Sequence, residues 1–138
     1  MRNIKYIALH CTATSTTSKP EAIVNYWKNA LGWSKPGYHY LIDYQGNIHK
    51  LADESEICNG VKGFNAVSVH VSYIGGVDAQ GHPKDTRSPA QLATMAQIVK
   101  DLHARYPGAK IQGHRDFPNV LKACPSFDVA AWLKQIGL

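Results

Sequence analysis

Two histidines and one cysteine stand at positions where they could bind a zinc ion. His10 lies near the end of a strand-like run, His114 follows a second short run, and Cys124 comes ten positions later. Zinc accepts imidazole nitrogen and thiolate sulfur, and a catalytic site uses three protein ligands and leaves one position for water. Sheet proteins place functional groups at strand ends and in the loops that follow. The pattern is therefore compatible with a metal-assisted hydrolase.

The same residues also have simpler interpretations. A histidine at a strand end is commonly a surface or hydrogen-bonded side chain, and a cysteine before a proline is commonly a small buried hydrophobe. Neighbouring strand residues face opposite sides, so Cys11 should point into the core if His10 binds metal. Cys58 is expected to be structural. With three cysteines at least one must be unpaired, and a disulfide framework is not expected.

The elements that would position these residues follow from hydrophobic periodicity and from turn and cap signals. Strands are expected at 4–11, 38–44, 48–51, 67–74 and 110–113. One helix is expected after Ser18 to near Gly32, a second from Ser88 to about Tyr106, and a third after Asp128. This order predicts one α/β domain over residues 1–138, with a central mixed sheet of about five strands flanked by three helices.

The composition excludes several classes of protein. Hydrophobic residues make up 44% and charged residues 18% of the 138 residues, which is typical of a globular chain. The formal net charge is +5, but the basic residues are scattered, so a nucleic-acid-binding module is not expected. No run has transmembrane length, and membrane insertion is not expected. The start of the chain lacks the apolar run of a signal peptide. We therefore expect a monomer made in the cytoplasm that meets an external target only after release or injection.

Several motifs together carry a resemblance to a known family. The run Ile7–Thr14 (IALHCTAT) resembles the first-strand motif of the type-2 N-acetylmuramoyl-L-alanine amidases. That family includes phage lysozymes of amidase type and animal peptidoglycan recognition proteins. Further matches follow in the family's order, at Gly32-Trp33, Gly37–Tyr40, Gly63–Asn65, Gly75–Asp78, Gly113–Asp116 and Lys122–Asp128. Each motif alone is weak, but their shared order covers nearly the whole chain.

The resemblance implies roles for particular residues. It makes His10, His114 and Cys124 ligands of Zn²⁺, and it makes Tyr38 and Lys122 catalytic. Without the resemblance, Tyr38 would be read as a core aromatic and Lys122 as a solvated charge. It also places Phe64 and Asn65, less specifically, along the groove for the glycan and peptide. His39, within the Gly37–Tyr40 motif, is expected to contact substrate too. His70 stands where the family pattern leads us to expect a small or aliphatic residue, and it is expected to narrow the groove or contact substrate.

The activity implied is hydrolysis of the amide bond between N-acetylmuramic acid and L-alanine in peptidoglycan, by a zinc-activated water. The alternative is a non-catalytic peptidoglycan-binding module of the same fold. A zinc peptidase acting within the stem peptide is a third possibility, but the H-E-x-x-H helix is missing. A structural-zinc or DNA-binding domain fits poorly, because there is no paired C-x-x-C.

Overall fold

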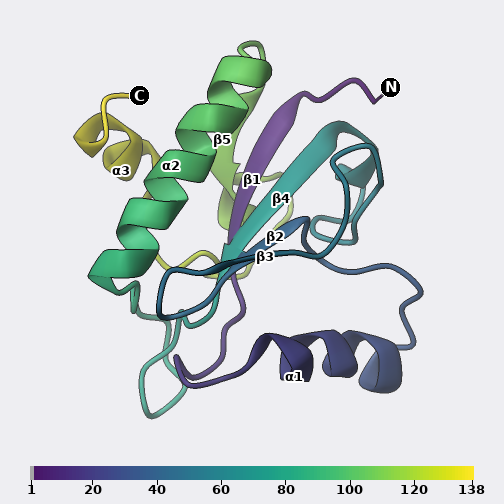
Figure 1. Cartoon of the computed structure of the whole chain (residues 1–138), viewed down its shortest axis with the longest axis vertical. Helices are drawn as coiled ribbons and strands as arrows, with labels where there is room; N and C mark the ends of the chain where they lie inside the picture. The colour runs from purple at the N-terminus through teal and green to yellow at the C-terminus, as the bar shows by residue number, and fades with distance from the viewer. Residues whose placement is uncertain (1) are drawn as a thin grey trace.

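A computed structural model describes residues 2–138 and shows a twisted five-stranded sheet (Figure 1). The strand order is β3-β2-β4-β1-β5, so β4 is the middle strand, and β1 lies between β4 and β5 and runs parallel to both. The hairpin of β2 and β3 adds the antiparallel pair. The strands are β1 (Tyr6–Cys11), β2 (Tyr40–Ile42), β3 (Ile48–Lys50), β4 (Ser68–Tyr73) and β5 (Lys110–Gly113). The predicted mixed sheet is confirmed.

Helices cover both faces of this sheet. Helix α2 (Pro89–Arg105) and helix α3 (Val129–Gln135) lie on one side, and α1 (Pro20–Asn25) lies on the other (Figure 1). Helix α1 continues into a π-helical turn at Tyr26–Ala30, and short 3-10 turns occupy Asn65–Val67 and His114–Asp116. The three predicted α-helices are confirmed. None of the helices in the described part of the chain is long and apolar enough to span a membrane.

The two faces of the central strands differ in chemistry. The face under α2 and α3 is apolar, and it includes Leu9 and Cys11 from β1 and Tyr73 from β4. The opposite face carries His10 and His70, both buried. Alternation along each strand separates the two sets. The expectation that Cys11 points into the core is confirmed.

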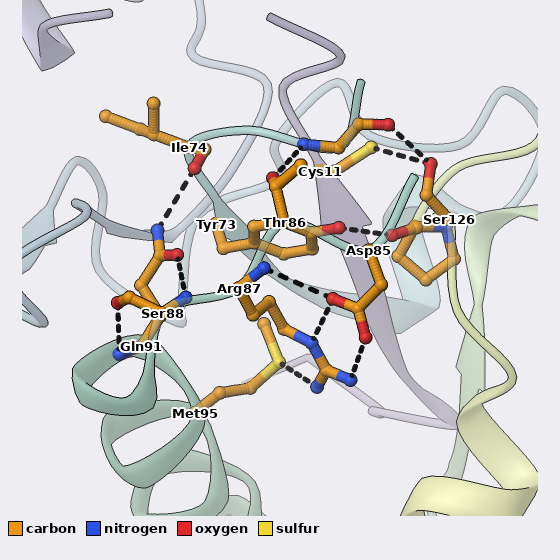
Figure 2. A network of polar contacts seen from close by, with 12 residues as sticks. Cys11, Tyr73, Ile74, Asp85, Thr86, Arg87, Ser88, Gln91, Met95 and Ser126 are labelled. Carbon is orange, nitrogen blue, oxygen red and sulfur yellow. Dashed lines mark hydrogen bonds and ion pairs between the residues drawn. The ribbon is translucent and has the colours of Figure 1, made fainter. Parts of the chain in front are cut away.

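The cap of α2 was predicted correctly and ties the helix to the sheet. The Ser88 hydroxyl accepts a hydrogen bond from the Gln91 backbone at 3.0 Å, and the Gln91 side chain accepts one from the Ser88 backbone at 3.0 Å. The buried Gln91 amide also donates to the Ile42 carbonyl oxygen at 3.2 Å and to the Ile74 carbonyl oxygen at 3.1 Å. Figure 2 shows the bond to Ile74. Asp128 caps α3 as expected, accepting from Ala131 at 3.2 Å.

The predicted cap of α1 was wrong. Ser18 does not cap the helix; Lys19 is the N-cap residue, without a side-chain hydrogen bond, and the helix begins at Pro20. A residue before proline is driven out of the helical region, and Lys19 is indeed extended, with φ −97° and ψ 150°. Lys19 therefore cannot be the first helical residue that a Ser18 cap would require.

Glu54 fastens the loop after β3 to the end of α2. Burial alone would raise the pKa of Glu54, but hydrogen bonds from Arg105, Tyr40 and Tyr106 lower it from 4.5 to about 2. Arg105 makes two of these contacts, at 2.6 and 2.8 Å, and the Tyr106 hydroxyl donates at 2.7 Å. The ionised carboxylate is therefore stabilised by the folded state.

We expect Glu54→Gln to lower the free energy of unfolding by about 2 kcal/mol at neutral pH. Since the folded pKa is depressed, this stability is present above pH 4.5 and is lost as the pH falls toward 2. Chemical denaturation at pH values from 7 to 2 checks it, and the difference between wild type and variant should shrink across that window. Asp101→Asn, which removes an exposed ion pair to the same Arg105, should have little effect.

Candidate metal centre and substrate groove

His10 and His114 meet because two parallel strands end together. Leu9 of β1 is in register with Gly113 of β5, so the residues that follow them, His10 and His114, lie side by side at the same end of the sheet. The two imidazole rings have centroids 5.0 Å apart. His10 is buried, whereas His114 is partly exposed at the start of a 3-10 turn. Asp116 closes that turn by accepting a hydrogen bond from the Gly113 backbone at 2.9 Å.

Cys124 is brought to the same edge by a loop that is anchored on both sides. Its carbonyl oxygen accepts from the Arg115 backbone at 2.9 Å, and its sulfur accepts from the Cys11 backbone at 3.2 Å. The following residues are held to the sheet. The Tyr73 hydroxyl donates to the Pro125 carbonyl at 2.7 Å, and Ser126 donates to the Gly76 carbonyl at 2.9 Å (Figure 2).

Arg87 supports this loop from the side of α3. Its guanidinium lies 3.4 Å from the centre of the Phe127 ring. The same guanidinium pairs with Asp85 at 2.9 Å (Figure 2). A cation over an aromatic face is attracted by the negative π surface of the ring. The segment that carries Cys124 is thus fixed at its carbonyl, at its sulfur and at the residues that follow.

The three predicted ligands form one donor cluster. One ligand atom from each of His10, His114 and Cys124 can be chosen so that all lie within 4.8 Å of one another. The Cys124 sulfur is 3.9 Å from Nδ1 of His10. Two imidazoles and one sulfur are donors that zinc prefers, and three protein ligands are typical of a catalytic rather than a structural site. The residues therefore fit a zinc ion.

The local electrostatics also fit a cation. Burial, with the neighbouring histidines, lowers the pKa of His10 well below its usual value. Burial and the Lys122 ammonium lower the pKa of His114 to about 4, so both rings are neutral at pH 7 and keep a lone pair. The side-chain hydrogen bond with the Cys11 thiol and burial raise the pKa of the Cys124 thiol. A positive ion at this position would favour its thiolate.

Tyr38 and Lys122 both border the cluster. The Tyr38 ring lies 5.0 Å from the His10 ring and edge-on to Trp27, and its hydroxyl donates to the Cys11 carbonyl at 3.2 Å. Burial raises the pKa of Tyr38, so the hydroxyl keeps its proton at neutral pH. Lys122 is exposed and lines the same cavity as the three donors, a space of about 180 Å³.

A wider groove of about 950 Å³ adjoins this cavity, and Asn59, Gly60, His114 and Lys122 line both. Phe64 and Asn65 line the wider part, which is where substrate-contacting residues would stand. Sequence reasoning assigned no site role to Trp33, although it lines both spaces. Its place in the Gly32-Trp33 motif was the available signal.

His39 and His70 do not line the groove, and the expectation that they contact substrate is corrected by their burial. Both are 0% exposed. His39 directly precedes β2. Its Nδ1 accepts a hydrogen bond from the His70 backbone at 3.0 Å, and its Nε2 lies 2.7 Å from the Glu56 carbonyl oxygen. His70 instead contacts His10, at 2.9 Å between Nδ1 and Nε2. The position of His70 inside a strand did not show how deeply its side chain is buried.

Comparisons with known proteins identify relatives of this chain. Residues 1–127 match the family model described as N-acetylmuramoyl-L-alanine amidase. The chain is 35% identical over 127 residues to the endolysin of Klebsiella phage KP32, covering 91% of this chain and 83% of that protein. Against the endolysin of Escherichia phage T7 the identity is 32% over the same length and coverage.

A solved structure supports the same assignment. The endolysin of the Thermus scotoductus bacteriophage Ph2119 superposes with a TM-score of 0.83 at 26% identity, covering 100% of this chain and 88% of that one. The family match, the phage relatives and the shared fold all point the same way. The chain belongs to the N-acetylmuramoyl-L-alanine amidase family.

Proposed function

We propose that this chain is a zinc-dependent hydrolase of the amide bond between N-acetylmuramic acid and L-alanine in peptidoglycan. The observation that carries the proposal is the cluster of His10, His114 and Cys124, which lines a cavity that adjoins the wider groove. A zinc ion held by these three side chains would polarise the scissile carbonyl and lower the pKa of a water molecule. The proposal rests on the family membership and on this donor set together.

The remaining site residues have complementary tasks. The protonated Tyr38 hydroxyl is a hydrogen-bond donor that can turn from the Cys11 carbonyl to the oxygen that gains negative charge during amide attack. Lys122 brings a positive charge to the same cavity, where it stabilises that oxygen or protonates the leaving amine. Phe64 and Asn65 border the groove that would hold the glycan and stem peptide.

We expect Lys122→Gln to lower kcat by about a hundredfold, because a charge next to the reacting atoms is lost. Zinc affinity should be unchanged, since Lys122 is not a ligand. The check is steady-state hydrolysis of a muropeptide together with zinc competition against a chromophoric chelator. Lys134→Gln on α3 is the matched control and should behave as wild type. Equal activity in the two variants would assign Lys122 to the solvated surface.

The second candidate is a peptidoglycan-binding module without catalysis. The groove alone is compatible with that function, but the complete donor set with Tyr38 beside it favours the enzyme. We also propose that residues 1–138 act as one domain and as a monomer. A site of action at the cell wall fits the phage relatives, which are endolysins.

Digestion of purified peptidoglycan tests the proposed function. Mass spectrometry of the soluble products should show free stem peptides that begin with L-alanine. They should disappear after chelation and return with added zinc. Cleavage within the stem peptide would indicate a peptidase instead. Retention on insoluble wall without released peptides would indicate the binding module.

A further inference from the structure

A buried chain of polar groups runs away from the metal centre behind His10. Nε2 of His10 lies 2.9 Å from Nδ1 of His70, and Nε2 of His70 lies 3.0 Å from the side-chain oxygen of Asn65. His10 comes from β1, His70 from the adjacent strand β4, and Asn65 from the 3-10 turn directly before β4. The exposed fractions of His10 and His70 are 1% and 0%.

Contacts with the backbone determine which Asn65 atom accepts a hydrogen bond from His70. Oδ1 of Asn65 also lies 3.0 Å from the Gly60 nitrogen and 2.7 Å from the Val61 nitrogen. Backbone N–H groups can only donate, so this atom must be the amide oxygen and not the amide nitrogen. An oxygen can only accept here. The nitrogen that faces it, Nε2 of His70, must therefore carry a proton.

The positions of the other ring protons of His70 and His10 follow from this one. A neutral imidazole has one N–H, and full burial disfavours the charged ring, so Nδ1 of His70 is an acceptor. Nε2 of His10 must then donate to it. This leaves the lone pair of His10 on Nδ1, the atom that lies 3.9 Å from the Cys124 sulfur. The chain of contacts thus selects one tautomer of His10.

We propose that His70 is a positioning residue, held by Asn65, that fixes the His10 ring and directs its Nδ1 to the metal. A hydrogen-bonded partner on the second nitrogen of a ligand histidine fixes its tautomer and orientation. The inference rests on the metal site of the proposed function, but not on the reaction. The same Asn65 side chain connects the groove to the metal site, because it also holds the Gly60-Val61 turn that lines the groove.

Gly60 provides the space that this arrangement needs. A Cβ at this position would lie 2.3 Å from Nδ1 of His70 and 2.5 Å from two further ring atoms. Gly60→Ala must therefore displace either the turn or the His70 ring. This gives a second variant that disturbs the contact while both histidines remain.

The first experiment uses the unmodified protein. Long-range ¹H–¹⁵N NMR of the histidine rings in the metal-free chain should show protonated Nε2 on both His10 and His70. With ¹¹³Cd bound, a metal–nitrogen coupling should appear at Nδ1 of His10. Protonated Nδ1 on His70 or on His10, or coupling at Nε2 of His10, overturns the proposal. If no metal binds, the proposed function fails, while the tautomers still decide the inference.

The second experiment compares two substitutions of His70. His70→Leu removes the acceptor, and zinc affinity, measured by chelator competition on folded protein, should fall by about 10- to 100-fold. His70→Asn keeps an acceptor near the Nδ1 position and should recover most of that loss. Gly60→Ala should weaken zinc binding in the same direction if His70→Leu does not fold. His49→Leu, at a partly exposed histidine outside the donor cluster, is the matched control. Unchanged affinity in folded His70→Leu would leave His70 as core packing alone.

Discussion

Cys124→Ser should abolish zinc binding at micromolar metal and lower muropeptide hydrolysis by about a thousandfold or more. A serine hydroxyl stays protonated where a thiolate would form, so one of three ligands is lost. Metal polarisation supplies several kcal/mol of transition-state stabilisation, and each 1.36 kcal/mol corresponds to a factor of about ten in rate. Zinc content by mass spectrometry and hydrolysis rates on the same samples measure both effects.

The matched control is Cys58→Ala, because Cys58 is also a free cysteine but is buried and is not a member of the ligand cluster. It should keep full zinc content and nearly full activity. The far-ultraviolet circular dichroism of both variants should equal that of wild type, which separates ligand loss from unfolding. A Cys124→Ser protein that still binds one zinc tightly and turns over normally would remove Cys124 from the metal centre.

Tyr38→Phe should lower kcat by about a hundred- to a thousandfold, with little change in zinc affinity. The substitution removes only the hydroxyl, which is the group expected to donate to the developing oxyanion. The ring should keep its packing against Trp27 and His10, at centroid distances of 5.2 and 5.0 Å. Rates under saturating muropeptide, together with binding of the uncleaved substrate, separate the effect on kcat from an effect on binding.

Tyr40→Phe is the control for this prediction. Its hydroxyl donates to Glu54, which is not part of the donor cluster. Loss of this hydroxyl should therefore affect stability rather than turnover. If Tyr38→Phe kept the wild-type kcat, the hydroxyl would be a structural group that only anchors the Cys11 carbonyl.

The sequence predicted the architecture well because periodicity and cap signals agree along most of the chain. The five strands and three α-helices were found in the right order, and β5 had the predicted bounds. Strand β2 is shorter than the predicted range 38–44. Tyr38 and His39 precede its ladder, and the Asp43 carboxylate caps a turn by accepting from the Gln45 and Asn47 backbone at 3.0 and 2.9 Å.

The candidate site was predicted in part, and its errors have one cause. Residue order and resemblance gave His10, His114 and Cys124 as a set, and strand register explains why two of them meet. His39 and His70 were expected to contact substrate, because their positions in the sequence do not tell which segments cover their side chains in the folded chain. Here the Gly60-Val61 turn and the Glu56 carbonyl cover them, through contacts that no sequence spacing encodes.

The most direct test of the central claim is a zinc titration of metal-stripped protein, with muropeptide cleavage measured at each addition. We expect no cleavage without metal and a rise that saturates near one zinc per chain, with peptide that begins at L-alanine as the product. Full cleavage by protein shown to be free of metal would mean that hydrolysis does not depend on zinc.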